Sequence, residues 1–135
     1  LDERNSGIDA QDPRRRDVTC RRARLLMDRT KNSISTDTLA SRVGVCRRTL
    51  ELAFSESIGI APQKYSRLVR LNGMHRLLKR VSPETLTVTD AAQSWGFTEL
   101  GRAAGYYREL FGETPAQTLR DNRSGNIRRF SDVLS

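Results

Sequence analysis

The sequence predicts an all-α fold of about seven helices, in which two small subdomains are joined by one long linker helix. Three observations lead to this prediction. Residues 62–81 contain no helix breaker after Pro62 except Gly73, the apolar face of this segment changes sides halfway along, and the segments before and after it repeat one pattern of residues. The 135 residues suffice for a single domain or for two very small ones that share an element.

The linker helix, predicted at 60–82, has two apolar faces. At roughly 100° per residue, its first apolar cluster falls on nearly the opposite side from its second. The first comprises Tyr65, Leu68 and Val69, and the second comprises Met74, Leu77, Leu78 and Val81. A helix that packs against a single core has a single apolar stripe. We therefore expect each half of the linker helix to pack into its own core. Arg67 and Arg70 are expected opposite the first cluster, and Gly73 is expected to be the place where the helix can bend.

The first predicted subdomain covers residues 13–59. The polar residues 1–12 that precede it show no apolar periodicity, and since the chain begins with Leu1 we expect them to be a flexible linker from a missing N-terminal region. The subdomain starts with a helix from Pro13 to near Thr30, whose apolar positions at helical spacing are Val18, Leu25 and Leu26.

Two shorter helices complete this subdomain. A cap-rich start at Ser35 opens the first, which ends at Gly44. The second begins at Arg47 and ends at Gly59, with Leu50, Ala53, Phe54 and Ile58 on its apolar side. Two short helices joined by a glycine turn, with arginines opening the second, are typical of a DNA-binding helix-turn-helix.

The second predicted subdomain, residues 83–120, repeats the first. Ala40 and Gly44 recur as Ala92 and Gly96, and the series Phe54, Glu56, Gly59 and Pro62 recurs as Tyr107, Glu109, Gly112 and Pro115. We therefore expect an internal duplication of one supersecondary unit. Its helices are predicted from Thr87 through Trp95, from 99 to 111, and from Pro115 to Arg120, and the tail 121–135 has a loop-like start.

Charge and residue usage narrow the class of function. Lys and Arg number 24 against 16 Asp and Glu, a formal net charge of +8, which favours nucleic acid or an anionic membrane surface as partner. No apolar run approaches the ~18 residues of a membrane span, so we expect a cytoplasmic protein.

Cys20, Cys46 and the single His75 form no usual zinc arrangement, and a nucleophile–His–acid set would have to use that one His. We therefore expect no metal, no cofactor and no enzymatic activity.

Residues from about 36 to 120 resemble the DNA-binding domain of AraC/XylS-type transcription regulators. The residues that carry the resemblance are Leu39-Ala40, Gly44, Leu50, Phe54, Gly59, Pro62-x-x-Tyr65, Arg70-Leu71, Leu77-Leu78, Val88-x-x-x-Ala92, Gly96-Phe97, Phe111-Gly112 and Pro115. The resemblance implies two helix-turn-helix units that bind double-stranded DNA. Their second helices, at about 47–58 and 99–111, would enter successive major grooves. The linker helix would span about 30 Å, close to the ~34–36 Å between such grooves.

Outward-facing residues of the two recognition helices are the candidate DNA contacts. In the first helix they are Arg47, Arg48, Glu51 and Ser55. The resemblance marks the positions of Arg48 and Glu51 for base contact, and Arg47 is better placed for phosphate. In the second helix they are Thr98, Glu99, Gly101 and Arg102. Arg102 is the strong donor there, and the small residues beside it allow a close approach of the backbone to DNA.

The function predicted from these observations is a sequence-specific DNA-binding domain of a bacterial-type transcription regulator, an activator that contacts RNA polymerase. The resemblance implies that effector binding and dimerisation belong to the missing N-terminal part. Two alternatives stay open. One is a fragment of an Ada-type DNA-repair regulator, which carries a similar double helix-turn-helix domain, and the other is a protein-interaction module that contacts RNA polymerase.

Overall fold

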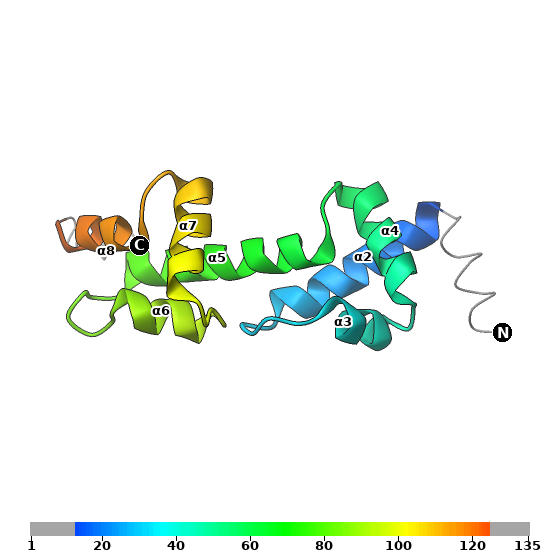
Figure 1. Cartoon of the computed structure of the whole chain (residues 1–135), viewed down its shortest axis with the longest axis horizontal. Coiled ribbons are helices and arrows are strands. Elements are labelled where there is room, and N and C mark those ends of the chain that lie inside the picture. Colours follow the sequence, from blue (N-terminus) through cyan, green and yellow to red (C-terminus); the bar gives the residue numbers. More distant parts are fainter. Residues whose placement is uncertain (1–12, 125–135) are drawn as a thin grey trace, which may run out of the picture. The chain divides into compact units, whose positions relative to one another are not determined.

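The computed structural model describes residues 13–124 and confirms the all-α fold. Its helices are α2 (Pro13–Asp28), α3 (Thr36–Val43), α4 (Arg47–Ile58), α5 (Pro62–Arg80), α6 (Val88–Ser94), α7 (Leu100–Phe111) and α8 (Pro115–Ser124), and the described residues contain no strand (Figure 1). They divide into two compact units, with the boundary between Val69 and Arg70 inside α5. The predicted linker at 1–12 and the part of the predicted tail after 124 lie outside the described residues.

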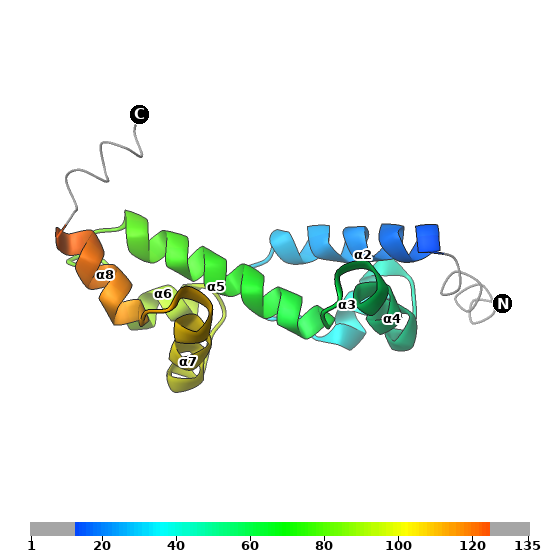
Figure 2. The ribbon, with the colours of Figure 1, turned by 90° about the horizontal axis from the view of Figure 1, so that it is seen from above.

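Unit 1 is built from α2, α3, α4 and the beginning of α5. Figures 1 and 2 show α2, α3 and α4 packed together. The core they enclose consists of Cys20, Ala23, Met27, Leu39, Ala40, Val43, Leu50, Ala53 and Phe54. Tyr65 of α5 closes it, because its ring meets the Phe54 ring edge-on at a centroid distance of 6.1 Å and its hydroxyl donates a hydrogen bond to Asp28 Oδ1 at 2.9 Å. The start of α5 is thereby fixed to unit 1.

The apolar side predicted for α2 is wrong in two of its three positions. Val18 and Leu25 are 46% and 51% exposed, and only Leu26 packs against the core. The residues that α2 buries are Cys20, Ala23 and Met27, which also recur at helical spacing. The larger, more hydrophobic Val and Leu side chains were predicted to be buried. The smaller Cys20 and Ala23 are buried instead, because they let α2 come close to its neighbours.

Unit 2 surrounds the remainder of α5. Its core consists of Leu71, Met74 and Leu78 from α5, Ala91 and Ala92 from α6, Phe97 from the turn after α6, and Ala103 and Tyr107 from α7. The start of α6 is fixed by a capping box, in which Thr87 accepts from the Asp90 backbone N–H and the Asp90 carboxylate accepts from the Thr87 backbone N–H. The predicted change of core along α5 is confirmed, since Tyr65 packs in unit 1 and Met74 in unit 2.

Two residues of α5 contact the turn that precedes α7. A Cβ placed on Gly73 would lie 2.4 Å from atoms of the Trp95 indole, and bending of the helix at Gly73 stays a prediction. Arg70 is only 9% exposed. Its guanidinium lies over the Phe97 ring at 4.5 Å from the centroid, and its Nη1 donates to the carbonyl oxygen of Gly96 at 3.4 Å. Both residues thus hold the turn 95–97, which leads into α7, against α5.

His75 belongs to a polar chain inside unit 2. Its ring is half-buried and stacks on Phe111 at a centroid distance of 4.0 Å, and its Nδ1 lies 2.8 Å from the Tyr107 hydroxyl. That hydroxyl donates to Thr118 Oγ1 at 2.6 Å, and Thr118 donates to Glu113. Burial lowers the pKa of His75 and raises the pKa of Tyr107 to about 12. The chain of hydrogen bonds ties α5 to α7 and α8.

The last helix extends to Ser124, four residues beyond its predicted end at Arg120. Asn122, 1% exposed, explains the extension. Its Nδ2 donates to the carbonyl oxygens of Leu78 at 3.0 Å and Val81 at 2.8 Å. These carbonyls lie at the end of α5, where carbonyl groups lack partners within the helix.

Asn122→Ala should lower the free energy of unfolding of unit 2 by about 1–3 kcal/mol, because it leaves two carbonyl groups at the end of α5 without their donor. Urea unfolding followed by circular dichroism measures the change. Asp121→Ala, at the exposed neighbouring position, is the control and should change stability by less than about 0.5 kcal/mol. Equal losses in the two variants would show that the Asn122 bonds do not anchor α8.

Candidate nucleic-acid interface

The exposed side of α4 carries all four residues predicted in unit 1. Arg47, Arg48, Glu51 and Ser55 are exposed, while Leu50 and Phe54 are fully buried on the opposite side. The helix begins at Arg47 because Cys46 has an extended backbone, and it ends because Gly59 adopts a positive φ of 73°. The two arginines therefore stand in the first turn of α4, where a recognition helix contacts base edges.

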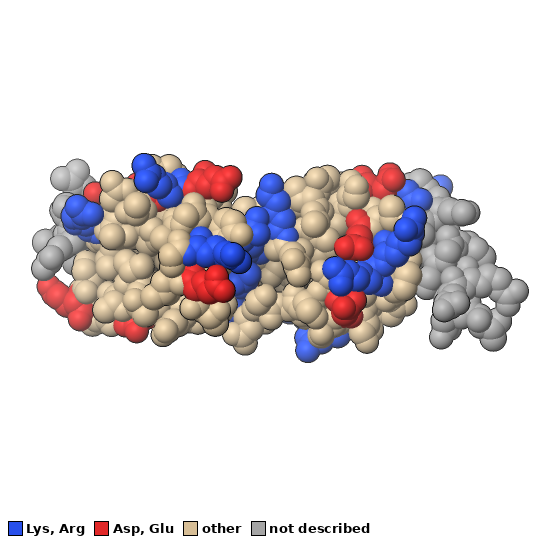
Figure 3. All heavy atoms as spheres, in the orientation of Figure 1, with Lys and Arg blue, Asp and Glu red and all other residues tan. Residues whose placement is uncertain are grey.

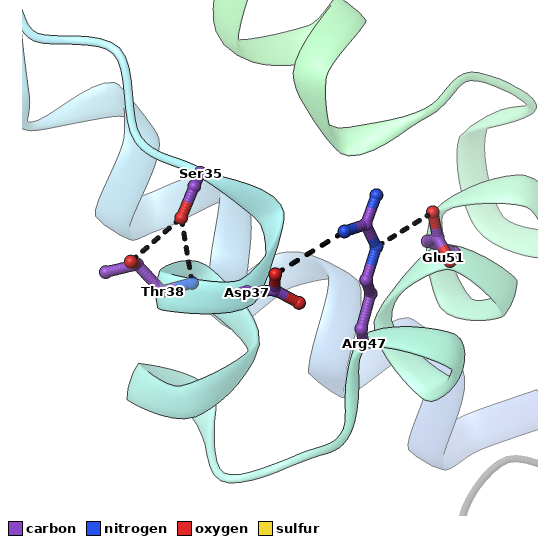
Figure 4. A network of polar contacts seen from close by, with 5 residues as sticks. All are labelled: Ser35, Asp37, Thr38, Arg47 and Glu51. Carbon is purple, nitrogen blue, oxygen red and sulfur yellow. Dashed lines mark hydrogen bonds and ion pairs between the residues drawn. The ribbon is translucent and has the colours of Figure 1, made fainter.

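Arg47 is held by two carboxylates (Figure 4). Its Nη1 lies 3.4 Å from Asp37 Oδ2 of α3, and its Nε lies 3.6 Å from Glu51 Oε2 one turn along α4. Exposed ion pairs of this kind contribute only about 0.2–1 kcal/mol. The guanidinium can therefore exchange them for a phosphate at small cost. Asp37 was not among the predicted contacts, and its place in the first turn of α3 is the only sequence signal for it.

Arg48 differs from its neighbour. It is exposed at the second position of α4, and no ion pair engages it within residues 13–124. Its donors are therefore available to an incoming base or phosphate without the loss of an existing ion pair. This makes Arg48 the strongest candidate for base readout in unit 1.

Cys46 stands directly before these arginines, at the N-cap position of α4. Its side chain makes no capping hydrogen bond, and its Sγ lies 3.1 Å from Thr49 Oγ1. The hydrogen bond with the Thr49 hydroxyl lowers the pKa of the Cys46 thiol.

The predicted residues of unit 2 lie together at the start of α7. Thr98, Glu99, Gly101 and Arg102 are all exposed. Glu99 is the N-cap residue, and its Oε2 lies 3.5 Å from Arg102 Nε. The predicted helix start at 99 is thus one residue early. As at Arg47, an exposed ion pair holds the arginine loosely enough for a phosphate to replace the carboxylate.

Arg108 is a further cation of α7 that is not among the predicted DNA contacts. It is exposed in the last turn of this helix. The repeat provides the signal that could have found it. α4 and α7 each have 12 residues and each end at a glycine with positive φ, Gly59 and Gly112. Aligned from their first residues, the two helices place Arg108 at the position of Ser55, which the sequence analysis did select.

The candidate interface carries charges of both signs. On the face drawn in Figure 3, basic side chains over α3 and α4 alternate with acidic ones. On this face the basic side chains of unit 1 thus stand beside acidic ones. Between residues 13 and 124 no helix is long and apolar enough to cross a membrane, and no three His, Cys, Asp or Glu residues could hold a metal ion.

Comparison with known proteins places this geometry in a family. The family model described as a helix-turn-helix domain matches residues 39–121. The crystal structure of a probable AraC family transcriptional regulator from Rhodopseudomonas palustris is 34% identical and superposes with a TM-score of 0.72, covering 78% of this chain and 97% of that one. The chain belongs to the AraC family.

Curated relatives agree with this assignment. A probable thc operon regulatory protein of Rhodococcus erythropolis is 38% identical over 82 residues, which are 61% of this chain and 25% of that protein. The XylDLEGF operon transcriptional activator of Pseudomonas putida is 36% identical over 90 residues, which are 67% of this chain and 28% of that protein. This AraC-family chain thus spans about a quarter of the length of the curated relatives it matches.

Membership in the family answers the broad functional question. The chain is a helix-turn-helix DNA-binding domain of a transcription regulator, and these findings favour this function over a DNA-repair fragment or a pure protein-interaction module. The AraC family is a family of DNA-binding regulators and not a class of enzymes.

Proposed function

We propose that this AraC-family domain recognises a specific duplex DNA sequence with α4 and α7, which enter successive major grooves. The observation that carries the proposal is the position of Arg48 in the first turn of α4, exposed and outside any ion pair of the described residues. A bidentate arginine on guanine is the commonest specific contact in the major groove. Glu51 and Ser55, one and two turns further along the exposed side, would contact the neighbouring bases or phosphates.

The roles of the other predicted residues follow from their charge and place. Arg47 would release Asp37 and Glu51 and bind a phosphate, because both its present contacts are at the surface. Thr98 and Gly101 would meet DNA at the start of α7, and Glu99 would release Arg102 to a phosphate. Phosphate contacts fix the position of a protein on DNA, and base contacts determine its sequence preference.

We propose further that the domain acts in transcription activation and contacts RNA polymerase. The support is the similarity to a relative named as a transcriptional activator. Effector binding and dimerisation would belong to parts of the full-length protein other than this chain, since the curated relatives are about four times as long as the matched region.

The two helix-turn-helix subdomains would comprise residues 13–59 and 83–120, and residues 60–82 would connect them.

The proposal is tested by selecting preferred sites from random duplex DNA and then measuring affinity for the selected site over a salt series. Specific binding with an affinity that falls steeply as salt rises is expected, because neutralised phosphates release counterions. A chain that selects no sequence and binds RNA polymerase with little salt dependence would instead be an interaction module.

Arg102→Ala should weaken binding to all DNA sequences by a similar factor, because the proposed contact of Arg102 is a phosphate. Affinities for the selected site and for variants of it in each half, measured by fluorescence anisotropy, test the expectation. The slope of log affinity against log salt should become shallower by about 1. A loss of preference limited to one half-site would assign Arg102 to base readout.

A further inference from the structure

Two glycines of α7 are not explained by any contact among residues 13–124. Gly101 and Gly105 are exposed helical residues, and a Cβ added to either would meet nothing within 4 Å. Glycine in a helix interior is less stable than alanine. By contrast, Gly73 is required by the Trp95 ring, and Gly59 ends α4 with a positive φ. The absence of side chains at 101 and 105 therefore calls for a reason outside the described residues.

The two glycines share one face of α7 with a cation. Residues spaced by four and three positions line up along a helix, so Gly101, Gly105 and Arg108 form one exposed row. Ala103 and Tyr107 face the core of unit 2. In the register of the repeat, this row corresponds to Arg48, Leu52 and Ser55 of α4, which include two of the proposed DNA contacts of unit 1.

Resting on the proposed function, we infer that α7 meets DNA with the row Gly101–Gly105–Arg108. The bare positions 101 and 105 bring the helix backbone close to the groove, and Arg108 binds a phosphate at the groove edge. The two units thus use one face of equivalent helices in different ways. The α4 face presents the long Arg48 side chain to the bases, whereas the α7 face presents main chain and one cation. Arg102, on another side of α7, adds a separate phosphate contact.

The decisive property is that stability and affinity should change in opposite directions. Gly101→Ala and Gly105→Ala should each raise the melting temperature, since the added methyl group meets nothing and alanine favours the helix. Each should also weaken binding to the selected DNA site by about tenfold, because the methyl group keeps α7 away from the groove. A merely structural role of these glycines cannot produce both changes together.

Arg108→Ala provides a second test of the inference. We expect an affinity loss whose salt slope is shallower by about 1 than that of the unmodified domain, with the melting temperature little changed. Arg76→Ala, which removes the same charge from an exposed position of α5 in the same unit, is the matched control and should leave the slope nearly unchanged. Arg108→Lys should retain most of the affinity.

The outcomes separate the inference from the proposed function. If the unmodified domain selects no DNA sequence, the proposed function fails and the inference with it. If it does bind specifically and the alanine variants keep its affinity, only the inference is overturned. A fall in melting temperature for Gly105→Ala would also overturn it, by showing that the glycine is needed for folding. A loss of stability without a loss of affinity in Arg108→Ala would show that Arg108 supports the helix end and not DNA binding.

Discussion

Gly73→Ala is expected to destabilise unit 2 by about 1–3 kcal/mol, as overpacking of a core does. The added Cβ would lie 2.4 Å from the Trp95 ring, so the indole or α5 must shift. The turn that follows Trp95 leads directly into α7, and Arg70 holds the same turn through Gly96 and Phe97. We therefore expect DNA affinity to fall together with stability, as the proposed second recognition helix loses its fixed position.

A double-mutant cycle isolates the cause of this effect. Combining Gly73→Ala with Trp95→Ala should make the glycine substitution nearly neutral or stabilising, because the clashing ring is gone. Gly105→Ala is the matched control for stability. It makes the same chemical change at a position of α7 where the added methyl group meets nothing within 4 Å. If the destabilisation by Gly73→Ala is the same with and without the indole, the close contact with Trp95 is not its origin.

Arg48→Ala should weaken binding to the selected DNA site by about 1–3 kcal/mol and relax the preference at one or two base pairs. The residue is exposed in the first turn of α4, away from the buried Leu50 and Phe54, so the fold of unit 1 should be unaffected. A second site selection with the variant reads the preference directly.

Glu56→Ala, at an exposed position on the last turn of α4, is a charge-changing control. It breaks the ion pair of Glu56 with Arg16, whose oxygen and nitrogen lie 3.2 Å apart, but it should leave base preference unchanged. A selected site that is identical for Arg48→Ala and the unmodified domain would remove Arg48 from base readout.

The spacing of apolar residues and the residues that begin and end helices predicted most of the fold. Glycines that end helices, such as Gly59, and caps such as Ser35 and Thr87 act through neighbouring residues in the sequence, so they can be read from it. The repeat predicted that α4 and α7 are equivalent, and the structure gives both helices the same length. The outward residues of α4 were predictable because two large buried residues, Leu50 and Phe54, define the opposite side.

The features that could not be predicted are contacts between residues distant in the sequence. Nothing near Gly73 reveals that an indole from residue 95 will lie against it, and nothing near Arg70 reveals the Phe97 ring beneath its guanidinium. Likewise, nothing near His75 reveals its hydrogen bond with Tyr107, which is 32 positions away. In α7 the sequence predicted a close approach to DNA at Gly101 but gave no signal for Gly105. That a Cβ at either position would meet nothing within 4 Å is known only from the structure.

We propose that α4 and α7 both enter the major groove of one DNA site. Methylation interference at guanine N7, an atom exposed in the major groove, tests it most directly on the selected site. Two clusters of interfering guanines, about 10–10.5 base pairs apart, are predicted. The cluster assigned to α4 should disappear in Arg48→Ala while the other persists. A single cluster that Arg48→Ala leaves intact would contradict the account.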